Sequence, residues 1–263
     1  LVNVAVYNNN GDIAIGSGNS KDAQALTVTT GSEIVNGALS ITNYADGSDY
    51  LNEILVTDKL QATGAITIIN KEIDVNAEGS IITDNLTASA VGNLNLGSKD
   101  NQLHNVTLAT ENGSIMLGNG NSAGDALNIS IQGGQPVQGN ISITNYMNGL
   151  DNSIRFQTAL QATGDIELVN EEGNITVTTN TSISGKRVML RAAESIYNHA
   201  SVSAKEGITL HADKDLVNYA ALKTRNGNIE LIANEDVLNL GVVETLKGNI
   251  DIISHDGVIY NVF

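Results

Sequence analysis

Residues 227–231 read Gly-Asn-Ile-Glu-Leu, and residues 248–252 read Gly-Asn-Ile-Asp-Ile, 21 positions later. A related stretch, Gly-Ile-Thr-Leu, begins at Gly207. Within each stretch apolar and polar residues alternate, which is the pattern of a β-strand with one face buried. Gly and Asn interrupt every apolar run before it reaches the length of a helix. This part of the chain is therefore predicted to consist of short strands separated by tight turns.

A second motif, two apolar residues followed by Asn, recurs between these stretches. Successive copies are 20, 21 and 22 residues apart, and their asparagines are Asn198, Asn218, Asn239 and Asn261. Stacked Asn amides can hydrogen-bond from one strand to the next along a fibre-like axis. We predict that these four residues form a structural column.

A unit of about 21 residues cannot bury its own apolar face, whereas stacked units bury a continuous core. We therefore predict an all-β fold, a right-handed parallel β-helix, for the whole chain. Dividing the 263 residues by the repeat length gives roughly twelve coils of about 21 residues. At the usual strand spacing such a rod would be about 60 Å long.

The N-terminal half repeats over a longer distance. The pentapeptide Ser-Ile-Thr-Asn-Tyr occupies residues 40–44 and again 142–146, and Leu-Gln-Ala-Thr-Gly occupies 60–64 and 160–164. A block of about 100 residues has thus been duplicated. We expect one continuous solenoid with two parts: an irregular half with longer loops over residues 1–165, and a regular half over residues 166–263.

Composition narrows the functional classes. The chain carries 13 Lys and Arg against 29 Asp and Glu, which gives a net charge of −16, and it has no Cys. Such a charge repels nucleic acids, so no nucleic-acid partner is expected. No apolar run is long enough for a membrane-spanning helix, so no membrane insertion is expected. Because the sequence begins without Met or a signal-peptide pattern, it is expected to be a mature fragment or an excised segment.

The repeats at residues 227–231, 248–252, 212–218 and 233–239 resemble those of a known family. The first two are Gly-Asn-Ile-x-apolar motifs, and the last two are Ala-x-x-x-apolar-apolar-Asn motifs. They are similar to the haemagglutinin repeats of filamentous haemagglutinin-like exoproteins, which are adhesins and toxin carriers of two-partner secretion in Gram-negative bacteria. The resemblance covers about the last hundred residues. It implies a secreted β-helical shaft that an outer-membrane transporter exports.

Two polar loops at corresponding positions of the duplicated block depart from the regular repeat. Such departures are where solenoids usually carry binding residues. The candidate receptor-binding residues in these loops are Asp46, Ser48, Asp49, Tyr50, Asn148, Asp151 and Asn152. Residues 46–49 and 148–151 lack the pattern of a calcium-binding loop, and the Gly-rich loops at residues 16–22 and 118–125 lack that of a phosphate-binding loop, so we expect no metal and no cofactor.

Six Asn-x-Ser/Thr triplets occur, beginning at Asn85, Asn105, Asn128, Asn140, Asn174 and Asn180. In a chain rich in Asn and Thr, composition alone accounts for this number. Glycosylation at these positions is the weaker of the two interpretations.

The main enzymatic alternative is a β-helical polysaccharide lyase or glycosidase. These enzymes use clustered carboxylates and a basic residue on one face of the coil. The arginines are few, the four histidines are scattered, and adjacent acidic pairs such as Glu171-Glu172 are typical of solvated turns. No catalytic residues are therefore assigned, and a cleft lined by at least three converging charged residues would favour the enzyme.

We expect an extracellular structural shaft or adhesion segment of a large secreted bacterial surface protein. Its expected partners are a receptor or glycan on a host or bacterial cell, neighbouring β-helix segments and the outer-membrane transporter. A loop-borne glycan- or receptor-binding domain is the alternative among binding proteins.

Overall fold

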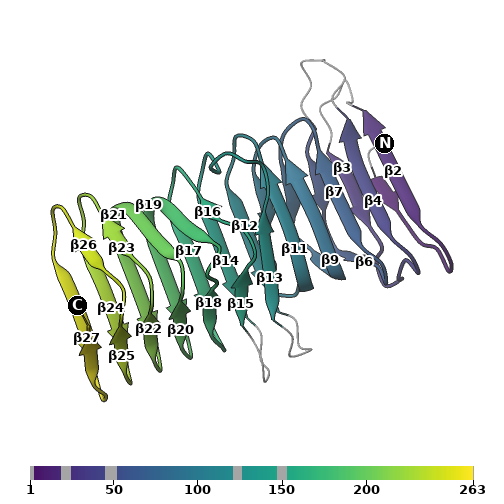
Figure 1. Ribbon diagram of the computed structural model, residues 1–263. Coiled ribbons are helices and arrows are strands. Elements are labelled where there is room, and N and C mark those ends of the chain that lie inside the picture. The colour runs from purple at the N-terminus through teal and green to yellow at the C-terminus, as the bar shows by residue number, and fades with distance from the viewer. Residues whose placement is uncertain (1–2, 19–24, 45–51, 121–125, 147–152, 263) are drawn as a thin grey trace.

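The computed structural model describes residues 3–18, 25–44, 52–120, 126–146 and 153–262. The described residues form strands and turns and no helix, so none of them belongs to a helix that could cross a membrane. Two parallel sheets wind through about 11 turns of an elongated solenoid, with the N-terminus at one end and the C-terminus at the other (Figure 1). The predicted parallel β-solenoid with a repeat of about 21 residues is confirmed.

Each turn contributes to both sheets. Sheet 1 contains β1 (Asn3–Ala5), β3 (Leu26–Thr29), β5 (Ile54–Val56), β8 (Val75–Ala77), β10 (Leu94–Leu96), β12 (Ile115–Asn119), β14 (Ile141–Asn145), β16 (Leu160–Gln161), β17 (Ile166–Asn170), β19 (Ser182–Ala192), β21 (Ser201–Ala212), β23 (Leu222–Thr224), β24 (Ile229–Ala233), β26 (Val243–Thr245) and β27 (Ile250–Ser254). Sheet 2 contains β2 (Ile13–Gly18), β4 (Leu39–Tyr44), β6 (Lys59–Gln61), β7 (Ile66–Asn70), β9 (Ser80–Ala90), β11 (Gln102–Thr110), β13 (Leu127–Ile131), β15 (Ile154–Phe156), β18 (Ile175–Val177), β20 (Ile196–Asn198), β22 (Leu216–Asn218), β25 (Val237–Asn239) and β28 (Ile259–Asn261).

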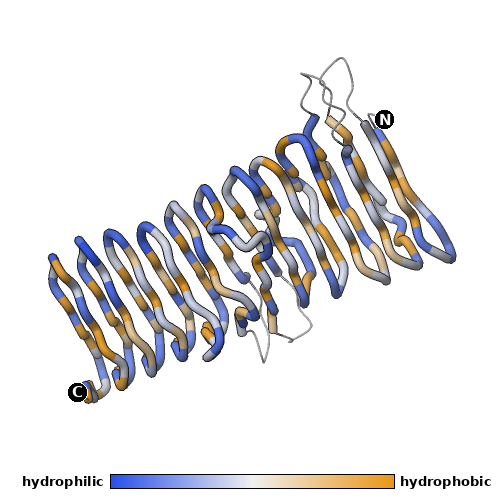
Figure 2. The backbone as a smooth tube through the Cα atoms, turned by 45° about the horizontal axis from the view of Figure 1, so that its top comes forward, coloured by the Kyte–Doolittle hydropathy of each residue, from blue (hydrophilic) through white to orange (hydrophobic). Residues whose placement is uncertain are grey.

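The repeated motifs lie directly on top of one another. Ile208, Ile229 and Ile250 are opposite each other in β21, β24 and β27, and all three strands run parallel. Because side chains alternate between the two faces of a strand, every second residue points into the solenoid. This alternation appears as hydrophobic and hydrophilic bands along each turn (Figure 2).

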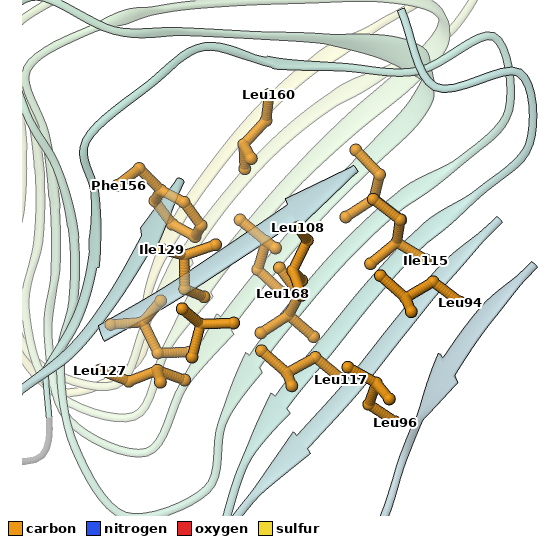
Figure 3. Packing of buried hydrophobic residues seen from close by; sticks show 14 of the residues in the cluster. Leu94, Leu96, Leu108, Ile115, Leu117, Leu127, Ile129, Phe156, Leu160 and Leu168 are labelled. Carbon is orange, nitrogen blue, oxygen red and sulfur yellow. The ribbon is translucent and has the colours of Figure 1, made fainter. Parts of the chain in front are cut away.

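The core is narrow and continuous. It consists of Leu, Ile, Val and Ala side chains from both sheets, and Phe156 is the one aromatic residue in the described core. Figure 3 shows the middle of this core, where Phe156 lies near Ile129 and Leu160. Two sheets that face each other across such a short distance leave little room for large rings, which explains the low aromatic content of 3%.

A third row of short strands, here called the edge strip, runs beside the two sheets and changes side along the molecule. In the N-terminal part it consists of β6, residues 80–82 of β9 and residues 102–103 of β11. Here each strip segment is followed along the chain by residues of sheet 2. In the C-terminal part it consists of β16, the first residues of β19 and β21, β23 and β26, and it leads into sheet 1. The change takes place between β11 and β16.

The duplicated block explains this change. Strands β2, β4, β7 and β9 lie in sheet 2, whereas their copies β12, β14, β17 and β19 lie in sheet 1. Four whole turns separate β2 from β11 in the order of sheet 2, and β12 follows β11 half a turn later in sheet 1. The copy is therefore displaced by four and a half turns, so that each duplicated strand faces the opposite side of the solenoid.

The last turn of the described chain exposes its inward-pointing residues. The side chains of Ile250 and Ile259 are 42% and 46% exposed, whereas Ile229 and Val237, one turn earlier, are fully buried. The described C-terminal end of the core is thus an apolar surface bordered by strand edges.

Candidate functional site

The predicted receptor-binding loops fall in parts of the chain that the structure does not describe. Asp46, Ser48, Asp49 and Tyr50, like Asn148, Asp151 and Asn152 of the second loop, lie outside the described residues. Their binding role stays a prediction.

The structure places the four asparagines of the predicted column in one continuous ladder. Asn198, Asn218 and Asn239 each donate a side-chain hydrogen bond of 2.7 Å to the amide oxygen of the next asparagine, which ends with Asn261. The first three are fully buried at the end of their strands in sheet 2. Because the ladder satisfies buried amide groups inside the core, its role is structural.

Two further buried ladders were missed by the sequence analysis. Asn43 donates to Asn70 at 3.1 Å, and Asn119, Asn145 and Asn170 are linked by bonds of 3.1 and 3.2 Å. Each of these residues lies at the end of an alternating strand, or one position before the end in the case of Asn43, and follows two apolar side chains that lie in the core. The pattern apolar-x-apolar-x-Asn in the printed sequence is the signal that could have identified them.

A polar hollow of about 520 Å³ on the outer face of sheet 2 is the strongest candidate for a binding site. It extends over β9, β11, β13 and β15, which lie side by side near the middle of the solenoid (Figure 1). Its lining residues are Asp84, Asn85, His104, Asn105, Ala126, Asn128 and Arg155.

The hollow lies where the N-terminal edge strip ends. In β9 and β11 the strip precedes the strand of sheet 2, but β13 begins at Leu127, directly after the buried Ala126. The backbone N–H of Leu103, in the last strip segment before β13, donates a hydrogen bond of 3.0 Å to the amide oxygen of Asn119. The hollow thus lies beside the part of the solenoid in which the edge strip changes side.

A row of three outward-facing amides crosses the hollow. Asn105 donates to the amide oxygen of Asn85, and Asn128 donates to that of Asn105, both at 3.2 Å. The three residues lie directly opposite one another in β9, β11 and β13, and Arg155 of β15 continues the row. Strand pairing therefore fixes the position of every member of the row.

A row of hydroxyl groups runs alongside the amide row. Thr87, Thr107 and Ser130 follow the three asparagines by two positions and point to the same side of the sheet. Ser130 donates to Gln157 at 3.2 Å, whereas Thr87 and Thr107 make no side-chain hydrogen bond within the described chain. These Asn-x-Thr/Ser triplets were noted in the sequence as glycosylation motifs, and the structure shows that three of them stack.

The charged groups of the hollow lie at its two ends. At one end, Nδ1 of His104 is 3.0 Å from Oδ1 of Asp84, whose side chain is 76% exposed. At the other end, the exposed guanidinium of Arg155 makes neither an ion pair nor a hydrogen bond within the described residues. Among the described residues, no three His, Asp or Glu side chains lie close enough together to hold a metal ion.

This arrangement is suited to bind a polar ligand. Amide groups both donate and accept hydrogen bonds, and a free guanidinium binds a carboxylate through two parallel bonds. Among the described residues, the lining contains one carboxylate, that of Asp84, whereas most glycosidases use two. The hollow thus has more of the groups needed to hold a sugar than of those needed to cleave one.

Two other hollows differ in character. One of about 450 Å³ on sheet 1 is lined by Glu53, Glu78, Asn76 and Asn95, which give it negative charge. Another of about 680 Å³ lies over the turns that follow β7, β9 and β11, and Lys71 and Glu111 are its charged residues. Neither combines an aligned amide row with an unpaired cation.

Comparisons with known proteins identify no relative: no family model matches the sequence, and no curated protein or solved structure matches the chain.

Proposed function

We propose that the chain is an extracellular structural shaft, the spacer segment of a large secreted bacterial surface protein. The observation that carries this proposal is the unbroken core that runs through about 11 turns of parallel sheet. At the usual strand spacing these turns make a rod about 50 Å long. A solenoid of this kind gives length and stiffness without a catalytic centre.

The surface chemistry supports a shaft. The net charge of −16 keeps neighbouring rods apart, which limits the edge-to-edge association to which exposed strands are prone. The buried amide ladders add hydrogen bonds along the axis in addition to those of the backbone. Both features favour a rod that persists in a dilute and protease-rich environment.

The exposed apolar side chains of the last described turn form a surface on which another β-helical turn can stack. Ile250 and Ile259 have the positions of Ile229 and Val237, which the following turn buries. A further β-helix segment of the same repeat would cover them in the same way. We therefore include neighbouring β-helix segments among the partners of this chain.

The place of action and the export route rest on the repeat motifs. Their resemblance to haemagglutinin repeats supports export by an outer-membrane transporter of two-partner secretion and a location at the cell surface. Protease treatment of intact producing cells, followed by immunodetection of this segment, tests the location. Complete protection of the segment in intact cells and its cleavage after lysis would refute a surface location.

The shaft role is tested by replacement. The segment is displayed between an outer-membrane anchor and an adhesive tip, and it is compared with a Gly/Ser linker of 263 residues. We expect the native segment to keep the tip extended and protease-resistant, and the flexible linker to lose both properties. Equal adhesion and equal protease resistance for the two versions would contradict the proposal.

A further inference from the structure

We propose that the polar hollow on sheet 2 binds an extended glycan that contains a carboxylate-bearing sugar, with the carboxylate at Arg155. This binding function goes beyond the shaft role and does not depend on it. It uses the strand face rather than the loops at residues 46–50 and 148–152.

Arg155 is the residue that would select a carboxylate-bearing sugar. Its guanidinium is exposed and without an ionic partner within the described residues, and it lies at one end of the amide row. Its neighbour Phe156 points into the core and is almost fully buried, which anchors the strand from behind. The planar fork of a guanidinium matches the two oxygens of a carboxylate better than an ammonium group does.

The amide row supplies the hydrogen bonds for the rest of the sugar chain. Asn128 donates to Asn105, but its own amide oxygen accepts no hydrogen bond within the described residues. That free acceptor lies opposite Arg155 in the neighbouring strand. A sugar with its carboxylate on Arg155 therefore finds an acceptor for a hydroxyl group one strand away.

The spacing of the strands fits an extended polysaccharide. Adjacent strands are about 4.7–4.9 Å apart, and one sugar unit of an extended β-linked chain advances by a similar distance. The four strands of the hollow thus offer room for about three sugar units along the solenoid axis. The hydroxyl groups of Thr87 and Thr107, which make no hydrogen bond to the described protein, lie beside this path.

The acidic surroundings restrict the ligand. Asp84 lies at the far end of the row, and the whole chain carries a charge of −16. A densely sulfated polymer would be repelled, whereas a glycan with isolated carboxylates would place one of them at Arg155 and neutral units over the amides. We therefore expect the site to prefer alternating acidic and neutral sugars.

The test uses isothermal titration of the full chain with three probes: hyaluronan oligosaccharides, uncharged chitin oligosaccharides and heparin fragments. We expect hyaluronan fragments to bind most tightly, and Arg155→Gln to weaken their binding by roughly tenfold or more. Arg155→Lys, which keeps the charge but not the planar fork, should lie between the two. Asn105→Ala, which interrupts the amide row, should weaken hyaluronan and chitin fragments alike.

The matched control is Arg191→Gln. Arg191 is also exposed and has no ionic partner within the described chain, but it lies on sheet 1 and lines none of the hollows described above. It should leave binding unchanged. Equal losses in Arg155→Gln and Arg191→Gln, equal affinity for hyaluronan and chitin fragments, or tightest binding of heparin would each overturn the proposal. Circular dichroism of every variant shows whether a loss of binding reflects a loss of the fold. If Arg155→Gln does not fold, the comparison of Arg155→Lys with the parent chain tests the proposal instead.

Discussion

At the scale of single residues, the buried asparagines stabilise the solenoid because each one satisfies the next. Asn218 accepts a hydrogen bond from Asn198, and it donates to Asn239 and to the backbone oxygen of Ala220. A side-chain amide is costly to bury without a hydrogen-bond partner. The removal of one asparagine therefore affects the asparagines on both sides of it.

We expect Asn218→Ala to lower the free energy of unfolding by about 1–3 kcal/mol, because it leaves the amide of Asn198 without its acceptor in the core. Urea unfolding followed by circular dichroism measures the change. Asn226→Ala is the control, because Asn226 is exposed and its side chain makes no hydrogen bond within the described residues. Similar losses in both variants would contradict a special role of the ladder.

One ion pair predicts a pH dependence at the same scale. Arg187 hydrogen-bonds to Asp165 and holds the pKa of that carboxyl below its usual value of 3.8. The pair therefore stabilises the fold above that value, and its contribution is lost as the pH falls below 3.8 through the lowered pKa. Both side chains are partly exposed, so the effect is small.

Arg187→Gln should lower the urea midpoint slightly near neutral pH, and the difference from the parent chain should shrink as the pH falls below 3.8. Arg225→Gln, which removes an exposed arginine without an ionic partner in the described part, should show no such pH dependence. A deficit of Arg187→Gln that persists unchanged in acid would show that the arginine acts through packing rather than charge.

At the scale of strands and turns, close contact between successive turns requires glycine. A Cβ atom at Gly227 would lie 1.3 Å from the backbone oxygen of Glu206 in the preceding turn. Gly207 has more space, since a Cβ atom there would lie 3.4 Å from the backbone oxygen of Asn228. The glycine of the Gly-Asn-Ile motif is thus dictated by the stacking distance.

We expect Gly227→Ala to destabilise the chain by about 1–3 kcal/mol, because the turn must move away from its neighbour. Gly207→Ala should cost less than about 1 kcal/mol, since its new methyl group makes only ordinary contacts. Thermal and urea unfolding of the two variants measure the difference. A larger loss for Gly207→Ala would show that backbone conformation, and not stacking, selects these glycines.

At the scale of the whole molecule, the number of whole or half turns that precede a strand decides which sheet it joins, and therefore which residues share a face. Removing residues 199–218 joins Asn198 to Tyr219 and deletes one whole turn, so every later strand keeps its sheet. Removing residues 203–212 deletes about half a turn, so the strands that follow must exchange sheets or lose their register. In the natural chain the duplicated block begins again half a turn after β11, and its copies therefore lie in the opposite sheet.

We therefore expect the whole-turn deletion to unfold cooperatively and to shorten the rod by about 5 Å in solution scattering. The half-turn deletion should lose cooperativity or solubility. If both deletions were equally stable, the turns would not depend on the identity of the strands below them.

The sequence by itself determined the architecture. The 21-residue period, the alternation within residues 227–231 and 248–252, and the spacing of the Asn column are local patterns, and each requires stacked parallel strands. These features need no knowledge of distant contacts, because each turn pairs only with its immediate neighbours. The ladder from Asn198 to Asn261 follows from the same local repeat.

Only the tertiary structure decided which sheet each duplicated strand joins. With turns of about 21 residues, an offset of 102 residues would amount to almost five whole turns, and the copies would share a face. The first turns are longer: Ile13 lies opposite Leu39, and Leu39 opposite Ile66, whereas Ile66 lies opposite Leu86. The sum is four and a half turns, because small differences in turn length accumulate along a solenoid. The hollow, its amide row and the unpaired Arg155 result from this sum and from no single motif.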